Sequence, residues 1–223
     1  MNEASTILVR NKEYVCKKDK ILYLIIKRVF DFLMSLISII LFSPLFIIMV
    51  VAIRVDSKGK AIYKHKRIGK NGKYIYLYKF RTMYTNSKEM LDEILKDPER
   101  KKEWDTYYKL TNDPRVTKVG KFLRKTSLDE LPQLLNILFG EMSFVGPRPV
   151  VDGEIEKYGE DKDKFLSVLP GLTGWWACNG RSTIGYENRK KLELYYVDNR
   201  SILLDLKVLF KTFIEVFKRT GAK

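Results

Sequence analysis

The chain has 223 residues, enough for one folded domain with additions and short for two full domains. It carries 42 Lys and Arg against 27 Asp and Glu, and the formal net charge of +15 favours a polyanionic partner: nucleic acid, anionic lipid or a phosphorylated substrate. Cys16 and Cys178 lie far apart and the single histidine, His65, has no catalytic motif around it. The sequence therefore indicates no disulfide framework, zinc site or Ser-His-Asp site, and a reducing, cytosol-facing location is expected.

Residues 29–53 form an apolar run with one charge, long enough as a helix, at about 1.5 Å per residue, to cross a hydrocarbon core about 30 Å thick. Basic residues flank the run on both sides, and positive charge resists translocation, so both ends should stay cytoplasmic. Near the middle lies Ser43-Pro44, where proline lacks the N–H that a continuing helix requires. A re-entrant helix broken at Ser43 and Pro44 explains the length and the flanks, whereas a single transmembrane span explains only the length.

Asp31 stands at the start of this apolar run, four residues after Lys27 and three after Arg28. On a helix, these spacings bring side chains together. We therefore expect Asp31 to pair locally with these cations rather than to act in catalysis.

Residues 61–83 predict a β-hairpin. Asn71-Gly72 is a favoured two-residue turn, and the following YIYLYKF alternates tyrosines with apolar residues. The basic residues of the hairpin should then project in a regular row.

Two further regions predict helices. Residues 84–112 are highly charged and interrupted by a proline, as in short solvent-facing helices. Residues 201–223 repeat apolar side chains at helical spacing with lysines elsewhere on the wheel, which indicates an amphipathic helix. The sequence leaves open whether this helix lies on anionic lipid or packs on the protein core.

Residues 126–133, TSLDELPQ, place two adjacent carboxylates, Asp129 and Glu130, in this cationic chain. A helix beginning near Asp129 accommodates Pro132 in its first turn and sets both carboxylates at the positive end of the helix. There both should stay ionised, which suits a nucleophile and a metal ligand better than a general acid. Ordinary capping would also explain an isolated SxxE.

Other short motifs suit phosphate. Arg124 lies five residues before Asp129, and GPRP holds Arg148 between two prolines that restrict the backbone. Arginine presents a fork matched to phosphate oxygens. PGLTG, and NGR ending in Arg181, are glycine-rich loops of the kind that bring backbone close to a ligand. Together these features predict a phosphate-rich substrate at the bilayer surface.

At these motifs the chain resembles the bacterial sugar transferases, the monotopic phosphoglycosyl transferases that move a sugar-1-phosphate from a nucleotide diphosphate sugar to a polyprenol phosphate. The resemblance covers nearly the whole chain after residue 26. It rests on an ordered set of motifs: KRVFD, the Ser-Pro break, RIGKNGK, KFRTM, SLDELPQ, VGPRP, PGLTG and NGR. Ala177 stands where the family often has glutamine, which puts the substrate contacts of that loop in doubt.

The resemblance implies that Asp129 is a nucleophile that forms a phosphosugar-enzyme intermediate, and that Glu130 belongs to the same catalytic pair. It implies Mg²⁺ held through Asp129. The substrates would be a UDP-sugar and undecaprenyl phosphate, met at membrane lipid on the cytosolic face of a bacterial inner membrane, without nucleic acid. The substrate-binding residues that the motifs imply are Lys79, Arg81, Arg124, Arg148 and Arg181.

The expected fold is α+β and mainly helical, with a small catalytic domain that contains a β-hairpin and interfacial amphipathic helices. We expect an N-terminal extension at 1–26, the re-entrant membrane helix at 27–54, the cytosolic catalytic domain at 55–200 and the amphipathic helix at 201–223. A different class remains open, a non-catalytic membrane-associated protein that binds anionic lipid or nucleic acid. That alternative explains the charge but leaves the Asp-Glu pair unexplained.

Overall fold

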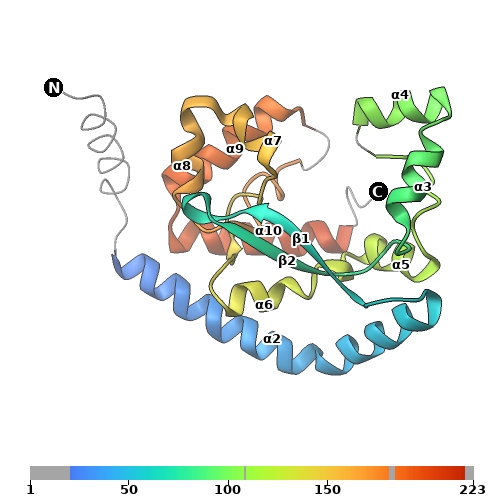
Figure 1. Ribbon diagram of the computed structural model, residues 1–223. Helices are drawn as coiled ribbons and strands as arrows, with labels where there is room; N and C mark the ends of the chain where they lie inside the picture. The colour runs from blue at the N-terminus through green and yellow to red at the C-terminus, as the bar shows by residue number, and fades with distance from the viewer. Residues whose placement is uncertain (1–20, 108, 181–183, 219–223) are drawn as a thin grey trace. The chain divides into compact units, whose positions relative to one another are not determined.

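The computed structural model describes residues 21–107, 109–180 and 184–218 and is mainly helical, with two small sheets (Figure 1). The expected class, α+β and mainly helical, is confirmed. The elements in chain order are α2 (Ile21–Asp56), β1 (Ile62–Ile68), η1 (Lys70–Gly72), β2 (Tyr74–Phe80), α3 (Ser87–Ile94), α4 (Pro98–Tyr107), α5 (Lys118–Thr126), η2 (Leu128–Glu130), α6 (Gln133–Leu138), β3 (Ser143–Val145), α7 (Asp152–Ile155), η3 (Glu156–Asp161), α8 (Lys162–Leu166), β4 (Gly171–Thr173), α9 (Tyr186–Asn199) and α10 (Ile202–Lys218).

The chain divides into two compact units. Among the described residues, unit 1 comprises 21–40, 65–77, 133–180 and 184–218, and unit 2 comprises 41–64, 78–107 and 109–132. The division falls inside α2 and inside both strands of the hairpin, so each of these elements contributes residues to both units.

The apolar run lies in α2, which is a single helix that contains Pro44. The predicted break at Ser43-Pro44 is therefore not an interruption of the helix. A proline removes one backbone donor, and in an apolar segment the remaining backbone groups have no better partner than the helix itself. By length and composition, α2 is the one helix among the described residues that could cross a membrane.

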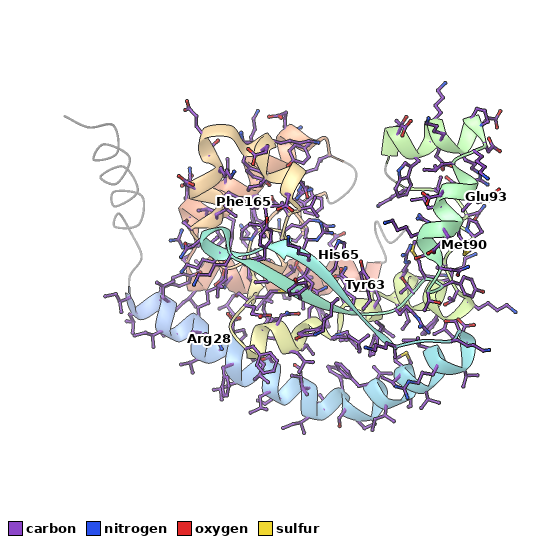
Figure 2. The ribbon with its side chains drawn as sticks, in the orientation of Figure 1. Arg28, Tyr63, His65, Met90, Glu93 and Phe165 are labelled. Atoms are coloured by element: carbon purple, nitrogen blue, oxygen red, sulfur yellow. The ribbon has the colours of Figure 1, made fainter. Side chains whose placement is uncertain are left out.

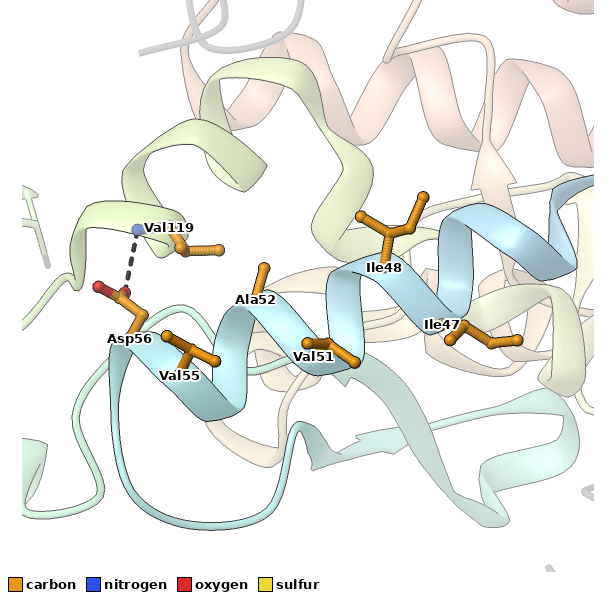
Figure 3. Close-up of a pocket in the computed structure, with 7 residues that line it drawn as sticks. All are labelled: Ile47, Ile48, Val51, Ala52, Val55, Asp56 and Val119. Atoms are coloured by element: carbon orange, nitrogen blue, oxygen red, sulfur yellow. Dashed lines mark hydrogen bonds between the residues drawn. The ribbon is translucent and has the colours of Figure 1, made fainter.

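The surface of α2 is strongly apolar. Its exposed side chains include Ile40 and Leu41 in the middle of the helix and Val55 near its end. In unit 2 a shallow groove of about 570 Å³ runs along the helix, lined by the residues that Figure 3 draws: Ile47, Ile48, Val51, Ala52, Val55, Asp56 and Val119. The only charged group in this groove, the Asp56 carboxylate, accepts a hydrogen bond from the Val119 N–H at 3.0 Å. Exposed apolar surface of this extent suits a lipid environment.

The β-hairpin is confirmed, with β1 and β2 as its strands. Asn71 and Gly72 both have positive φ, 56° and 75°, and the Lys73 N–H donates to the Lys70 carbonyl at 3.3 Å. This is the pattern of the two-residue turn that Asn-Gly favours, because both central residues must tolerate a left-handed backbone.

Unit 1 contains a second sheet that the sequence did not predict. The three-residue strands β3 and β4 pair in parallel, with Ser143 opposite Gly171 and Val145 opposite Thr173. A Cβ on Gly171 would lie 2.1 Å from the Gly146 nitrogen, so only glycine allows this approach. The first glycine of PGLTG, in a loop predicted to approach a ligand, thus lies against the backbone of Gly146 in VGPRP.

The helices of unit 1 pack in two groups, one of which contacts this short sheet. In Figure 1, α7, α8 and α9 lie together, and their core includes the fully buried Val150 and Tyr158. Val145 of β3 packs with Cys178, Tyr196 and Val208, which ties α9 and α10 to the sheet. Helix α10 therefore packs on the core through one face, while Leu203, Phe210 and other apolar side chains remain exposed on it.

The charged residues at the start of α2 do not pair as predicted. Lys27 forms its ion pair with Asp205 of α10, 178 residues away, at 2.8 Å. The Arg28 guanidinium, labelled in Figure 2, donates to the last carbonyls of α6, those of Ile137 and Leu138. Asp31 is buried and accepts the Phe144 N–H at 3.0 Å. These contacts hold α2 against α6, β3 and α10, so the expected local pairing of Asp31 was wrong.

In unit 2, a separate core joins the C-terminal half of α2 to β2 and α5. Its buried members are Ile53, Ala61, Phe80 and Leu123. No residue of α3 is buried, and the described side chains of α4 are exposed or half-buried, as predicted for solvent-facing helices.

Candidate active site

Helix α5 is positioned at its N-terminus by close backbone packing. A Cβ on Gly120 would lie 2.1 Å from the Thr82 carbonyl oxygen, so α5 can approach the end of β2 only because this residue is glycine. Thr117 caps the helix by accepting the Gly120 N–H at 2.9 Å, and Asp56 accepts the Val119 N–H. The first turn of α5 is thereby fixed to both β2 and α2.

The other end of α5 carries Arg124 and turns the chain into η2. The Arg124 Nε donates to Thr82 Oγ1 at 2.9 Å, which orients the guanidinium. Ser127 follows α5 with φ 57°, and its N–H donates to the Arg124 carbonyl. This left-handed cap ends α5 and sends the chain directly into the turn that holds the acidic pair.

Asp129 and Glu130 lie in this short 3-10 turn, not at the start of a longer helix. Helix α6 begins at Gln133, after Pro132. The expected helix start near Asp129 was therefore wrong, because Leu131-Pro132 separates the turn from α6. Three residues of 3-10 helix also build no extended helix dipole. Nearby side chains, rather than a helix terminus, set the electrostatics of the pair.

Two cations face the acidic pair. The Lys79 Nζ of β2 lies 2.6 Å from Glu130 Oε1, and both side chains are partly exposed. Burial raises the pKa of the half-buried Asp129 carboxyl, the charge of Glu130 raises it further, and Lys79 and Arg124 oppose the shift. Burial and the charge of Glu130 thus outweigh the two cations, and the pKa of Asp129 lies above its ordinary value. A carboxylate of raised pKa is a more basic nucleophile once ionised.

Arg81, a predicted substrate-binding residue, is buried in unit 2 and holds the C-terminal end of α2. Its guanidinium donates to the carbonyls of Ser57 and Lys58 at 2.6 and 2.9 Å, and to Ser57 Oγ at 3.0 Å. Ser57 and Lys58 directly follow α2, so these contacts satisfy backbone carbonyls of the segment that leaves the helix. The geometry supports a structural task for this side chain.

The remaining predicted residues lie elsewhere. Arg148 is an exposed residue of unit 1, beside Trp176, whereas Lys79, Arg124, Asp129 and Glu130 are brought together in unit 2. Arg181 lies outside the described residues. Ala177 directly follows Trp176 and is half-buried.

The acidic pair also provides the donors that a magnesium ion would use. The described part of the chain contains no group of three or more His, Cys, Asp or Glu side chains placed to hold a metal. Mg²⁺ at phosphate sites is commonly bound by one or two carboxylates together with substrate phosphates, so such a larger group is not required. Because Glu130 forms an ion pair with Lys79, Asp129 is the carboxylate better placed to bind the magnesium ion.

Sequence reasoning missed the residues that position the site. Thr82 orients Arg124, and Gly120 allows α5 to reach Thr82. One signal was available: a glycine inside the helical pattern KVGKFLR is unfavourable unless close packing requires it.

A family model and several known proteins match most of the chain. A model of the family described as bacterial sugar transferase matches residues 22–219. An uncharacterized sugar transferase of Haemophilus influenzae is 51% identical over 199 residues, 89% of this chain and 42% of that protein. The undecaprenyl-phosphate galactose phosphotransferase of Salmonella typhimurium is 48% identical over 198 residues, 88% of this chain and 41% of that protein.

The exopolysaccharide production protein ExoY of Sinorhizobium fredii is 46% identical over 197 residues, which are 88% of this chain and 87% of ExoY. The chain thus spans less than half the length of the first two relatives and most of the third. A family match over residues 22–219, together with these identities, leaves one conclusion. The chain belongs to the bacterial sugar transferase family.

Proposed function

We propose that this protein transfers a sugar-1-phosphate from a UDP-sugar to undecaprenyl phosphate and releases UMP. The observation that carries the proposal is the acidic pair of η2 with its two cations, where Lys79 binds Glu130 at 2.6 Å and Arg124 lies near the half-buried Asp129. The name of the Salmonella relative supports the acceptor and a hexose donor, and the name of ExoY supports a place in exopolysaccharide production.

In the first step, an oxygen of the Asp129 carboxylate attacks the phosphorus that bears the sugar. The bond from that phosphorus to the bridging diphosphate oxygen breaks, and UMP leaves with the bonding electrons. Lys79 and Arg124 offset the negative charge of the diphosphate in this step. The product is an aspartyl phosphosugar on Asp129.

In the second step, a phosphate oxygen of undecaprenyl phosphate attacks the same phosphorus. The bond to Asp129 breaks, the carboxylate is regenerated, and the lipid diphosphate sugar is formed. Glu130, held by Lys79, belongs to the catalytic pair through both steps.

Mg²⁺ held through Asp129 would supply positive charge that offsets the charge of the diphosphate. Arg81 contributes indirectly. It fixes the end of α2, which carries Asp56, and Asp56 accepts a hydrogen bond from the first turn of α5. Arg148 is proposed to bind phosphate, a task suited to its exposed guanidinium.

The membrane arrangement that we propose is re-entrant, at the cytosolic face of a bacterial inner membrane. Basic residues on both sides of α2 and the internal Pro44 support this topology. A shallow insertion brings a water-soluble donor and a lipid-tethered acceptor to one site. The exposed apolar groove of α2 suits contact with lipid chains.

The reaction is tested by incubating the protein, in detergent or lipid, with Mg²⁺, undecaprenyl phosphate and a panel of UDP-sugars that begins with UDP-galactose and UDP-glucose. We expect UMP release with one or more donors. Without the acceptor, about one UMP per active protein should be released, and a phosphosugar mass should remain on the peptide that contains SLDELPQ. No release from a broad panel would favour the non-catalytic lipid-binding or nucleic-acid-binding alternative.

Topology is tested with Cys16 as a probe, after Cys178 is replaced by serine. In intact cells, a membrane-impermeant thiol reagent should leave Cys16 unlabelled. Efficient labelling from outside would contradict the re-entrant arrangement. Replacing Ser43 and Pro44 by Ala and Leu should favour a spanning helix and increase the labelling.

A further inference from the structure

Unit 1 contains a small cavity beside the first turns of α2 that takes no part in the proposed reaction. Its volume is about 70 Å³. All of its lining residues belong to unit 1, and they come from the start of α2, the hairpin turn η1, the end of β3, the segment between α8 and β4, and the end of α9. One water requires about 10–15 Å³ of such space, so the cavity has room for a group of about five non-hydrogen atoms.

Cationic side chains predominate around this cavity. Four of them line it, against one carboxylate: Lys27, Arg28, Lys70 and Arg200, with Asp31 as the acid. Asp31 is buried and accepts the Phe144 N–H at 3.0 Å, so part of its hydrogen-bonding capacity is used within the protein. Lysine and arginine side chains donate hydrogen bonds and accept none. The lining therefore favours a ligand with negatively charged oxygens.

The charge of Lys27 is balanced within the protein. Its Nζ pairs with the Asp205 carboxylate at 2.8 Å. The same carboxylate accepts the hydroxyl groups of Tyr23 and Tyr196 at 3.0 and 2.6 Å. Three donors thus fix Asp205, and it neutralises Lys27 rather than the other cations of the cavity.

Arg28 and Lys70 are not balanced in this way. Arg28 donates to the Ile137 and Leu138 carbonyls at 2.7 and 2.8 Å, which orients its guanidinium without cancelling its charge. Among the described residues, neither Arg28 nor Lys70 forms an ion pair. Asp31 can balance only one of these two charges, so the cavity keeps a net positive charge.

The cavity reaches the surface next to apolar side chains of α2. Lys70 is an exposed lining residue, and Leu24, which also lines the cavity, is 38% exposed. The adjacent Ile21, Leu22 and Ile25 are exposed as well. An apolar surface therefore leads directly to a cationic cavity, a combination that suits a charged group carried on hydrocarbon chains.

The position of the cavity along α2 favours a membrane lipid. Lys27 and Arg28 directly precede the apolar run of residues 29–53. In the membrane arrangement proposed above, this is the depth of the lipid phosphates in the cytosolic leaflet, where basic pockets bind anionic head groups. A free phosphate ion would use the cations but not the exposed apolar side chains.

We propose that this cavity of unit 1 binds the phosphate of an anionic phospholipid, with the acyl chains along the exposed apolar side chains at the start of α2. The inference uses the proposed membrane arrangement and goes beyond the proposed reaction, because the cavity contains neither the acidic pair nor its two cations. A lipid bound there contacts α2, η1 and α9 at once, and it should stabilise unit 1.

The test uses the full chain in detergent with three ligands: dioctanoyl phosphatidylglycerol, dioctanoyl phosphatidylcholine and inorganic phosphate. The rise of the thermal midpoint with ligand concentration gives each Kd. Lys70→Glu places a negative charge at the cavity. Lys73→Glu is the matched control, because Lys73 is exposed in the same turn and does not line the cavity. Both variants should fold, since η1 contains no buried residue.

We expect phosphatidylglycerol to bind at least about 10-fold more tightly than either other ligand, because choline adds a positive charge and inorganic phosphate lacks acyl chains. Lys70→Glu should raise the Kd of phosphatidylglycerol about 10-fold, and Lys73→Glu should raise it less than about threefold.

An unchanged Kd in Lys70→Glu, or an equal loss in Lys73→Glu, would overturn the inference. Equal affinities for phosphatidylglycerol and inorganic phosphate would make the ligand a free phosphate, and equal affinities for the two lipids would remove selection by charge. Either result would overturn the assignment to an anionic lipid. UMP release is measured separately, so a protein that releases UMP without binding phosphatidylglycerol refutes this inference alone, and the reverse result refutes only the proposed reaction.

Discussion

Asp129 in unit 2 and Glu193 in unit 1 are both carboxyl groups near an arginine, and burial raises the pKa of each. Their hydrogen bonds differ. Glu193 accepts from the Arg148 N–H and Arg189 Nε through one oxygen and from the Tyr158 hydroxyl through the other. Among the described residues, no side chain donates a hydrogen bond to Asp129.

The difference separates a carboxyl group that holds the fold together from one that can react. The hydrogen bonds that Glu193 accepts occupy oxygen lone pairs that a nucleophile would need. The residue is also only 2% exposed, so a substrate cannot reach it. Asp129 is half-buried and sits in the field of two cations without being fixed by either. A perturbed pKa alone therefore does not identify a reactive group, since both carboxyls have one.

Replacing Asp129 tests the reactive side of this comparison most strongly. Asp129→Asn should lower UMP release at least about 10³-fold and abolish the covalent adduct, because an amide is a poor nucleophile. The thermal midpoint should not fall, since the substitution removes a partly buried charge.

The matched control for that variant is Asp105→Asn on the exposed surface of α4. It should change the rate by less than about twofold. An Asp129→Asn protein with full activity, or an adduct on another residue, would contradict the assignment of the nucleophile.

Removing a cation from the acidic pair should have the next largest effect. Lys79→Met leaves Glu130 without its 2.6 Å partner and should lower kcat about 100-fold. Stability should change little, because both side chains are partly exposed and such pairs contribute about 0–1 kcal/mol. Steady-state kinetics and thermal unfolding measure the two quantities separately.

Lys88→Met on α3 is the control for this charge change, as Lys88 is exposed. An equal loss of rate in Lys88→Met would indicate a general effect of net charge. A loss of stability without a loss of rate in Lys79→Met would make the pair structural, like the Glu193 cluster.

The structural side of the comparison is tested at Tyr158, which is 0% exposed. Tyr158→Phe leaves one oxygen of Glu193 without its donor and should lower the free energy of unfolding by about 1–3 kcal/mol. Tyr195→Phe, on a side chain that is 47% exposed, should change it by less than about 0.5 kcal/mol. If Tyr158→Phe and Tyr195→Phe lowered the free energy of unfolding equally, the hydrogen bond from Tyr158 to Glu193 would not stabilise the fold.

Asp113 of unit 2 should stabilise the fold by a smaller amount, and this stabilisation should depend on pH. Burial acts to raise its pKa, but hydrogen bonds and charge from Arg115 outweigh burial, so the pKa of Asp113 lies below its ordinary value of 3.8. A lowered pKa in the folded state means that the stabilisation is complete above pH 3.8 and is lost as the pH falls through the folded pKa.

Wild type should therefore be about 1 kcal/mol more stable than Asp113→Asn at pH 7, and the difference should shrink as the pH falls below 3.8. Denaturant unfolding at a series of pH values measures this. A difference that grows toward low pH would reverse the sign and contradict the role of Arg115.

The sequence by itself determined the local elements and the chemical types at the site. An apolar run of this length predicts a long helix, and Asn71-Gly72 predicts a turn, because helix length and positive φ depend on neighbouring residues alone. The adjacent Asp129 and Glu130 could likewise be found without coordinates. Their place in a 3-10 turn could not, since it depends on how Ser127 ends α5.

Only the tertiary structure decided which partner each charged side chain takes. The arginines of KFRTM and KFLRKT look equivalent in sequence, yet Arg81 holds the end of α2 and Arg124 stands beside Asp129. Lys27 pairs with Asp205 across 178 residues instead of with Asp31 four residues away. The physical reason is that a side chain's type is local, whereas its partner depends on backbone approaches between distant segments, such as the one that Gly120 permits at Thr82.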